Sequence, residues 1–320
     1  MLSAFALCVL AKEEPVVVNV LVINYDPIIE AEGGKRLHEA MKWRDPRELA
    51  EGYVKDMAEV SRGYVRLNIK EWRDVDEWPR KLDGFRYDDR SFMAVMRDKT
   101  EKDHQPDGAD YPFMLESQKV VPEMESGKFD ELWVFSFPFS GHWEAAMAGP
   151  DAFFINGGVY DKVPSRKRFA IMGFSYERGV AEMIHNTSHR TENHMRRVYG
   201  RWEPGKPTNL WERFSAFEQK SPGYAGVGNC HFPPNAEKDY DYANPRTVMS
   251  AADEWLSYPR LDGAKKPVNR ETWGGPDFQR NYLKWWFSRL PKQPGVAADG
   301  RQNNWWKYIY RFNDYDASGR

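Results

Sequence analysis

The sequence predicts an α/β fold, with a single mixed or parallel sheet flanked by helices and a helical, aromatic-rich C-terminal portion. Three observations lead to this class: apolar runs recur through the first half of the chain, a helical pattern joins two of them, and helical or irregular segments follow residue 176. With 320 residues, 41% of them hydrophobic, and a net charge of −2, the chain can bury a sizeable core and lacks the composition of a disordered protein.

Four segments have the composition of strands, and they are residues 15–29, 64–72, 130–139 and 168–176. A helical pattern over residues 45–63 joins the first two, with Asp45 as the N-cap, Pro46 in the first turn and Gly63 as the stop. Strand, helix and strand in close succession favour a parallel crossover unit.

Five later segments have helical patterns, and they are residues 177–199, 209–219, 244–258, 276–290 and 303–312. Glycine and proline concentrate between Gly200 and Thr208, which indicates a boundary there. The sequence thus predicts a core domain over residues 12–200 and a C-terminal portion over residues 201–320 that packs on it.

Residues 1–11, MLSAFALCVLA, are apolar and end in small residues before the polar KEEP. This pattern is typical of the end of a secretory signal peptide, and a buried first strand is the alternative. Without that segment Cys230 is the only cysteine, so no intramolecular disulfide is expected. No apolar run approaches the roughly 20 residues that span a bilayer. We therefore expect a secreted or periplasmic protein.

The helix expected over residues 177–199 carries the most informative motif, GVAEMIHNTSHRTENHM. His185 and His189 are four residues apart and lie on adjacent turns of one face, where Glu182 and Glu192 also fall. The opposite face is apolar or small and would pack on the sheet together with His194. One stripe thus presents two imidazoles and two carboxylates.

This stripe has two interpretations. Two histidines at this spacing can reach one metal ion, and imidazole with carboxylate suits zinc or another divalent metal. The same side chains can also form a hydrogen-bonded polar layer, because Glu182 and His185, like His189 and Glu192, are neighbours on a helix. Both interpretations stay open at the level of sequence.

The motif is similar to the His-Glu-x-x-His helix of zinc peptidases, but Asn186 stands where those enzymes have a glutamate. That glutamate takes a proton from metal-bound water, which an amide cannot do. Hydrolysis would need another carboxylate as general base, and Glu182 and Glu144 are the two candidates.

A loop that follows a predicted strand, within residues 135–158, offers His142, Glu144 and Asn156. In α/β folds, loops at the carboxyl ends of strands commonly form the site. We therefore expect this loop to reach the histidine stripe.

A second long polar segment, residues 223–245, contains Cys230, His231 and Asn235. Either Glu192 or His231 would complete the metal ligands. Adjacent residues on an extended segment point in opposite directions, so Cys230 and His231 are not expected to act together as a nucleophile and its base. Cys230 is expected to be a buried small residue.

Three short motifs carry a family resemblance: Met172–Val180 is MGFSYERGV, His189–Glu192 is HRTE, and Glu144–Pro150 is EAAMAGP. On these motifs, residues 130–250 resemble an uncharacterised family of secreted bacterial proteins. The resemblance implies that the helix and both loops belong to one unit, and it implies no established activity. In that family the position of His185 also takes glutamate, which still permits a metal.

The leading hypothesis is a secreted metal-dependent hydrolase that acts on a peptide or a polysaccharide. Its site would consist of the ligands His185, His189, Glu192 and His231, the general base Glu182 or Glu144, and the substrate contacts His142, Asn156, Arg190 and Asn235.

The alternative hypothesis is a non-catalytic secreted protein that binds carbohydrate or a cell-surface polymer. Aromatic residues make up 15% of the chain, and exposed rings can stack on sugars. The rings expected to do so are Trp273, Trp285, Trp286, Trp305 and Trp306. Nucleic acid is not an expected partner, because 46 basic residues are balanced by 48 acidic ones without a basic stripe.

Overall fold

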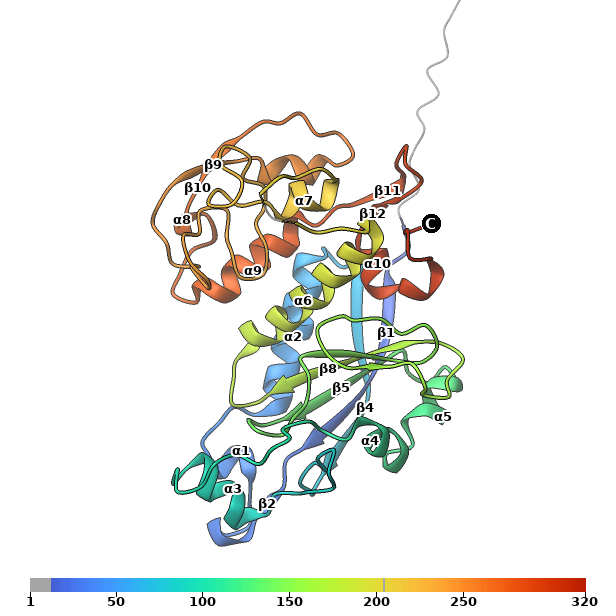
Figure 1. Cartoon of the computed structure of the whole chain (residues 1–320), viewed down its shortest axis with the longest axis vertical. Coiled ribbons are helices and arrows are strands. Elements are labelled where there is room, and N and C mark those ends of the chain that lie inside the picture. The colour runs from blue at the N-terminus through green and yellow to red at the C-terminus, as the bar shows by residue number, and fades with distance from the viewer. Residues whose placement is uncertain (1–12, 204) are drawn as a thin grey trace, which may run out of the picture.

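The computed structural model describes residues 13–203 and 205–320 (Figure 1). The predicted signal segment, residues 1–11, lies outside the described residues. Within the described part of the chain, no helix has both the length and the apolar character that crossing a membrane requires.

A six-stranded sheet forms the centre of the molecule, in the order β4-β1-β5-β8-β6-β7. Its first four strands are mutually parallel, β6 runs antiparallel to β8, and β7 runs parallel to β6. The bounds are β1 (Val16–Tyr25), β4 (Val65–Val75), β5 (Glu131–Ser136), β6 (Ala145–Ala148), β7 (Val159–Tyr160) and β8 (Phe169–Ser175). The sheet is therefore mixed, and the predicted α/β class and all four predicted strands are confirmed.

The crossover between β1 and β4 is helix α2 (Pro46–Val60). Asp45 caps it by accepting a hydrogen bond from the Arg47 backbone amide, and Pro46 takes the first helical position, where its missing amide hydrogen costs nothing. The helix ends three residues before Gly63, which adopts a left-handed conformation with φ of 77°. The predicted helix is confirmed, with an earlier end.

Several short elements follow β1 or lie between β4 and β5, and of these only β2 falls within a predicted strand, the one expected over residues 15–29. They are β2 (Ile28–Ile29), η1 (Glu30–Glu32), β3 (Lys35–Arg36), α1 (Leu37–Ala40), α3 (Asp89–Met96), α4 (Tyr111–Ser117) and α5 (Val120–Glu125). Part of the loop expected over residues 135–158 is also regular, because it contains strand β6.

Helix α6 (Val180–Tyr199) begins directly after β8 and ends at Gly200, whose φ is 69°. It contacts α2 and β8 on one side and α7, α9 and α10 on the other, so it lies between the sheet and the C-terminal portion (Figure 1). Three apolar and small side chains face the sheet as predicted: Ile184, Thr187 and Thr191 are all buried. Helix α6 therefore packs against both the sheet and the C-terminal portion.

The C-terminal portion contains α7 (Leu210–Ser215), β9 (Val248–Ser250), η2 (Ala252–Ser257), β10 (Lys266–Val268), α8 (Arg270–Trp273), α9 (Phe278–Arg289), β11 (Lys292–Val296), β12 (Gln302–Asn304), α10 (Trp306–Tyr310) and η3 (Phe312–Asp314). The prediction of a helix over residues 244–258 is wrong, because this segment forms β9 and the 3₁₀ helix η2. Of the helix expected over residues 303–312, Trp306–Tyr310 forms the α-helix α10, whereas Asn303 and Asn304 belong to strand β12.

The tryptophans of this portion are buried, so the expectation of exposed stacking rings was wrong. Trp286, Trp305 and Trp306 are completely inaccessible, and Trp273 and Trp285 are at most 9% exposed. Trp305 packs against Trp211 and Trp255 with ring centroids 6.2 and 5.4 Å apart. A single hydrophobic cluster contains these rings and the side chains of the sheet, so the C-terminal portion packs on the core.

Arg190 fixes α6 to the sheet through a buried ion pair. Its side chain is 1% exposed and donates to Glu131 of β5 at 2.7 Å and to the Ile309 carbonyl at 2.8 Å. The guanidinium carbon also lies 4.7 Å from the centre of the Tyr310 ring. Because its partners are all internal, Arg190 supports the fold.

Replacing Glu131 with Ala is expected to leave the Arg190 charge buried without a counterion, which costs about 3–5 kcal/mol of unfolding free energy. Urea denaturation measures this loss. Glu59→Ala is the control, because Glu59 forms an exposed ion pair with Lys284, worth less than about 1 kcal/mol. Equal effects of the two substitutions would contradict a structural role for the buried pair.

Candidate metal site

Helix α6 and the loop after α7 together place four metal-binding side chains in one group. His185 and His189 come from adjacent turns of α6, with ring centroids 4.6 Å apart. Cys230 and His231 come from the loop, and one potential donor atom from each of the four residues lies within 4.8 Å of all the others. The group can hold a metal ion, and the predicted convergence of His185, His189 and His231 is confirmed.

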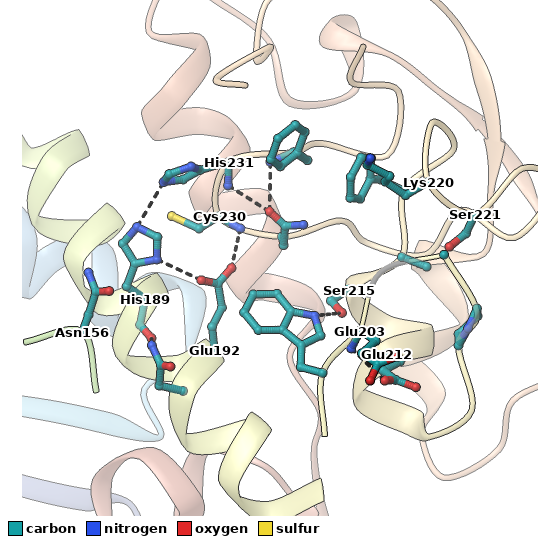
Figure 2. Close-up of a pocket in the computed structure, with 18 of the residues that line it drawn as sticks. Asn156, His189, Glu192, Glu203, Glu212, Ser215, Lys220, Ser221, Cys230 and His231 are labelled. Carbon is teal, nitrogen blue, oxygen red and sulfur yellow. Dashed lines mark hydrogen bonds and ion pairs between the residues drawn. The ribbon is translucent and has the colours of Figure 1, made fainter. Parts of the chain in front are cut away.

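Two carboxylates orient two of these imidazoles. Nδ1 of His189 lies 2.9 Å from Glu192, and Nδ1 of His231 lies 2.9 Å from Asp239. The Nε2 atoms of the two rings face each other at 3.1 Å (Figure 2). In the neutral rings, a hydrogen on each Nδ1 would satisfy the carboxylates and leave two unprotonated Nε2 atoms pointing at one another.

Glu192 was predicted as a metal ligand, but it lies beside the group and forms hydrogen bonds with two of its residues. One of its oxygens faces His189, and the other accepts the backbone amide hydrogen of Cys230 at 2.7 Å. The carboxylate is only 2% exposed. Glu192 therefore connects the helix to the loop and fixes the ring of one ligand, as carboxylates behind metal-bound histidines do.

Cys230 was expected to be a space-filling residue and instead contributes its sulfur to the group. Its Sγ lies 3.3 Å from Nδ1 of His185, and the residue is 1% exposed. The chain bends here, because Asn229 accepts hydrogen bonds from the backbone amides of His231 and Phe232. Adjacent side chains can therefore reach the same point, which an extended segment would not allow.

The electrostatic environment differs between the two helical histidines. Burial, together with the charges of His189 and His231, lowers the pKa of His185 to about 3. Burial alone would lower the pKa of His189 as well, but the hydrogen bond and charge of Glu192 outweigh it and raise that pKa. Burial also raises the pKa of the Cys230 thiol well above its usual value.

Two separate cavities are lined by members of the group. The first, which we call the aromatic cavity, has a volume of about 420 Å³ and is lined by His189, His231 and four large rings: Phe154, Trp202, Phe217 and Phe232. The second, which we call the acidic cavity, has a volume of about 720 Å³ and is lined by His185 and the carboxylates Asp107, Glu144, Glu177 and Glu182. The group is thus accessible from two directions.

Both candidate bases line the acidic cavity. Glu144 immediately precedes β6 and accepts a hydrogen bond from the Asn156 side chain at 2.5 Å. Glu182 is partly exposed, and it is tied to Gln279 at 3.2 Å and to Arg178 at 3.6 Å. The charge of Glu144 contributes to the raised pKa of His189, so this carboxylate acts on the group electrostatically.

Two of the four predicted substrate contacts lie at the cavities. His142 lines the acidic cavity, stacks on Tyr25 at 5.6 Å, and has its pKa lowered to about 3 by burial. Asn156 lines the aromatic cavity. Arg190 and Asn235 line neither one, and Asn235 is completely buried, where it donates to two backbone carbonyls.

No model of a known protein family matches the chain, and no curated protein matches it either. The resemblance to secreted bacterial proteins therefore stays a prediction. The class of this protein has to be inferred from the geometry of the site.

In metal-free protein, Glu192→Gln is expected to lower the pKa of His189, because the neutral amide no longer stabilises the imidazolium. Proton NMR of the histidine rings during a pH titration measures the change. Glu203→Gln is the matched control, since Glu203 also lines the aromatic cavity but pairs with Arg201. An unchanged His189 titration in Glu192→Gln would show that this carboxylate does not orient the ring.

Proposed function

We propose that this protein is an extracellular, metal-dependent hydrolase that holds a zinc ion with His185, His189, Cys230 and His231. The observation that carries this proposal is the pair of Nε2 atoms that face each other at 3.1 Å. Their Nδ1 atoms are both engaged by carboxylates, so when both rings are neutral the two Nε2 lone pairs face each other without a donor between them.

A cation removes this repulsion. A single shared proton would satisfy only the two nitrogens, whereas a metal ion would also take the Cys230 sulfur and the His185 ring. Imidazole and thiolate together are the donors that zinc prefers in proteins. The carboxylates of Glu192 and Asp239 complete two carboxylate–histidine pairs of the kind found behind zinc ligands.

Hydrolysis requires water beside the metal and a base that can take its proton. A zinc ion held by these four side chains would have to take water as a fifth ligand, or in place of one of the four, and would lower the pKa of that water. Water can approach the group at His189 and His231, because both rings are partly exposed. His185 and Cys230 are at most 2% exposed.

Glu144 is the base that the geometry favours. It has no ion-pair partner among the described residues, whereas Glu182 is tied to Arg178 and Gln279. The residue that holds Glu144 in place, Asn156, has a φ of 123°, which is strained for any residue except glycine. Strain of this kind concentrates at functional sites, where the surrounding structure maintains it.

The alternative of a non-catalytic carbohydrate-binding protein depended on exposed tryptophans. Since those rings are buried, the hydrolase is the better-supported function. The proposal of an extracellular location rests on the apolar N-terminal sequence alone.

Protein purified without a histidine tag is expected to contain one equivalent of zinc, or to take it up from zinc chloride. His189→Ala and Cys230→Ser should each lower the affinity at least tenfold, and acidification should release the ion as protons compete for His189. Elemental analysis and calorimetry measure both effects. A stoichiometry below a tenth of an equivalent after zinc addition would exclude the proposal.

Glu144→Gln is expected to retain the metal and to lose about 10²–10⁴-fold in hydrolysis, which is the usual contribution of a general base. Steady-state kinetics on casein and on soluble polysaccharides, with metal content measured in parallel, test this. Glu177→Gln is the control, since Glu177 lines the same cavity and is exposed. Equal rates for Glu144→Gln and the unmodified protein would remove Glu144 from the mechanism.

A further inference from the structure

The ring of Tyr240 lies against two of the four metal-binding side chains. Its centroid is 4.3 Å from that of His231, with an angle of 32° between the rings, and 5.9 Å from that of His185, with an angle of 18°. Tyr240 also lines the acidic cavity, together with His185 and Glu144. The phenol thus shares one cavity with a proposed ligand and with the proposed base.

The chain around Tyr240 is tied to the loop that carries the ligands. The backbone amide of Tyr240 donates to the His231 carbonyl at 3.1 Å. On either side of it, Asp239 pairs with Nδ1 of His231 at 2.9 Å, and the hydroxyl of Tyr242 donates to the Cys230 carbonyl at 2.8 Å. These three contacts fix the position of Tyr240 relative to His231.

Tyr240 occupies this position at a conformational cost. Its φ is 56°, in the left-handed region that residues other than glycine rarely adopt. The residue is 51% exposed, and within the described part of the chain only its backbone amide, not its hydroxyl, forms a hydrogen bond. Backbone strain of this kind concentrates at functional sites, and an exposed ring with an unused hydroxyl adds little to stability.

Other hydrogen-bond donors that line the acidic cavity are already engaged. Tyr242 is buried, and its hydroxyl is used on the Cys230 carbonyl. Arg178 lies 3.6 Å from Glu182, so its charge is paired. The free hydroxyl of Tyr240 can therefore donate to a bound molecule without breaking a bond inside the protein.

Hydrolysis of a carbonyl compound creates a need for such a donor. When water attacks the carbonyl carbon, a C–O bond forms and the π electron pair of the C=O bond moves onto its oxygen, which becomes negatively charged. The carboxylates that line the cavity would repel this charge, and they are Asp107, Glu144, Glu177 and Glu182. A donor aimed at the oxygen would offset the repulsion. Glycosides are cleaved through a cationic sugar and develop no such oxyanion.

We propose that Tyr240 is a catalytic residue that donates a hydrogen bond to the carbonyl oxygen of an amide or ester substrate. This inference rests on the proposed function and adds its substrate class. Glu144 takes a proton from the attacking water, and the C–N or C–O bond to the leaving group breaks as the C=O bond reforms. The leaving atom receives the electron pair of the broken bond and the proton from Glu144. Tyr240 keeps its own proton throughout.

The test compares Tyr240→Phe with the unmodified protein, both full-length and loaded with zinc. Phenylalanine keeps the ring against His185 and His231 and removes only the hydroxyl. We expect kcat on labelled casein or on p-nitrophenyl acetate to fall about 10²-fold, as for the loss of one oxyanion donor, while KM changes by less than about twofold. Zinc affinity by calorimetry and the melting temperature should be unchanged. Tyr224→Phe is the matched control, since Tyr224 is 68% exposed and lines neither cavity.

The outcomes separate this inference from the function on which it rests. Unchanged kcat in Tyr240→Phe, or a loss of activity that follows a loss of zinc, would remove Tyr240 from the chemistry while leaving a metal-dependent hydrolase. Cleavage of soluble polysaccharides alone, without casein or the acetate ester, would overturn the carbonyl substrate class in the same way. Protein that binds no zinc, or that cleaves none of these substrates, would overturn both proposals.

Discussion

Helix α6 is enclosed between the sheet and the C-terminal helices, and its polar side chains must therefore find partners inside the protein. Arg190 meets this constraint with Glu131, and Asn186 does so by donating to the Gly173 carbonyl at 2.7 Å. These bonds prevent the helix from rotating or sliding on the sheet. The orientation of His185 and His189 follows from that fixed position, since both rings project from the same rigid backbone. A site that requires ligand atoms to be placed within a fraction of an ångström is best carried on such an element.

The two carboxylates behind the imidazoles differ in a way that matters for metal entry. Glu192 is buried and bonded at both oxygens, so the His189 ring is held in one position. Asp239 lies on an exposed loop, and its side chain is 54% accessible to solvent. His231 is also the more exposed of the two rings, with 26% of its side chain accessible against 17% for His189, so an ion would reach the donors from the side of His231.

Sequence patterns predicted the parts of this protein that depend on periodicity. The parallel crossover and the face of α6 that carries His185 and His189 both follow from the spacing of side chains along regular elements. The predicted burial of Cys230 is confirmed, but its place beside the histidines was not predicted, because that place depends on a bend that Asn229 stabilises and that no apolar pattern records. The sequence did not predict the burial of Trp305 either, because a helical pattern of aromatic residues does not show which part of the protein covers those residues. Tertiary packing alone decides both questions.

Four nitrogen and sulfur donors would also suit a closed structural zinc site, so the surroundings must distinguish the two roles. Structural zinc ions generally stabilise small domains that lack an adequate core. This protein has a continuous hydrophobic cluster that extends from the sheet into the C-terminal helices, which is the kind of core that such small domains lack. The donors line two cavities, one of which also contains Glu144, a carboxylate without an ion-pair partner among the described residues, and the other Asn156, whose backbone is strained. The proposed hydrolytic site would require open access and a base and would commonly contain such strain, whereas a closed structural site has no need of these features.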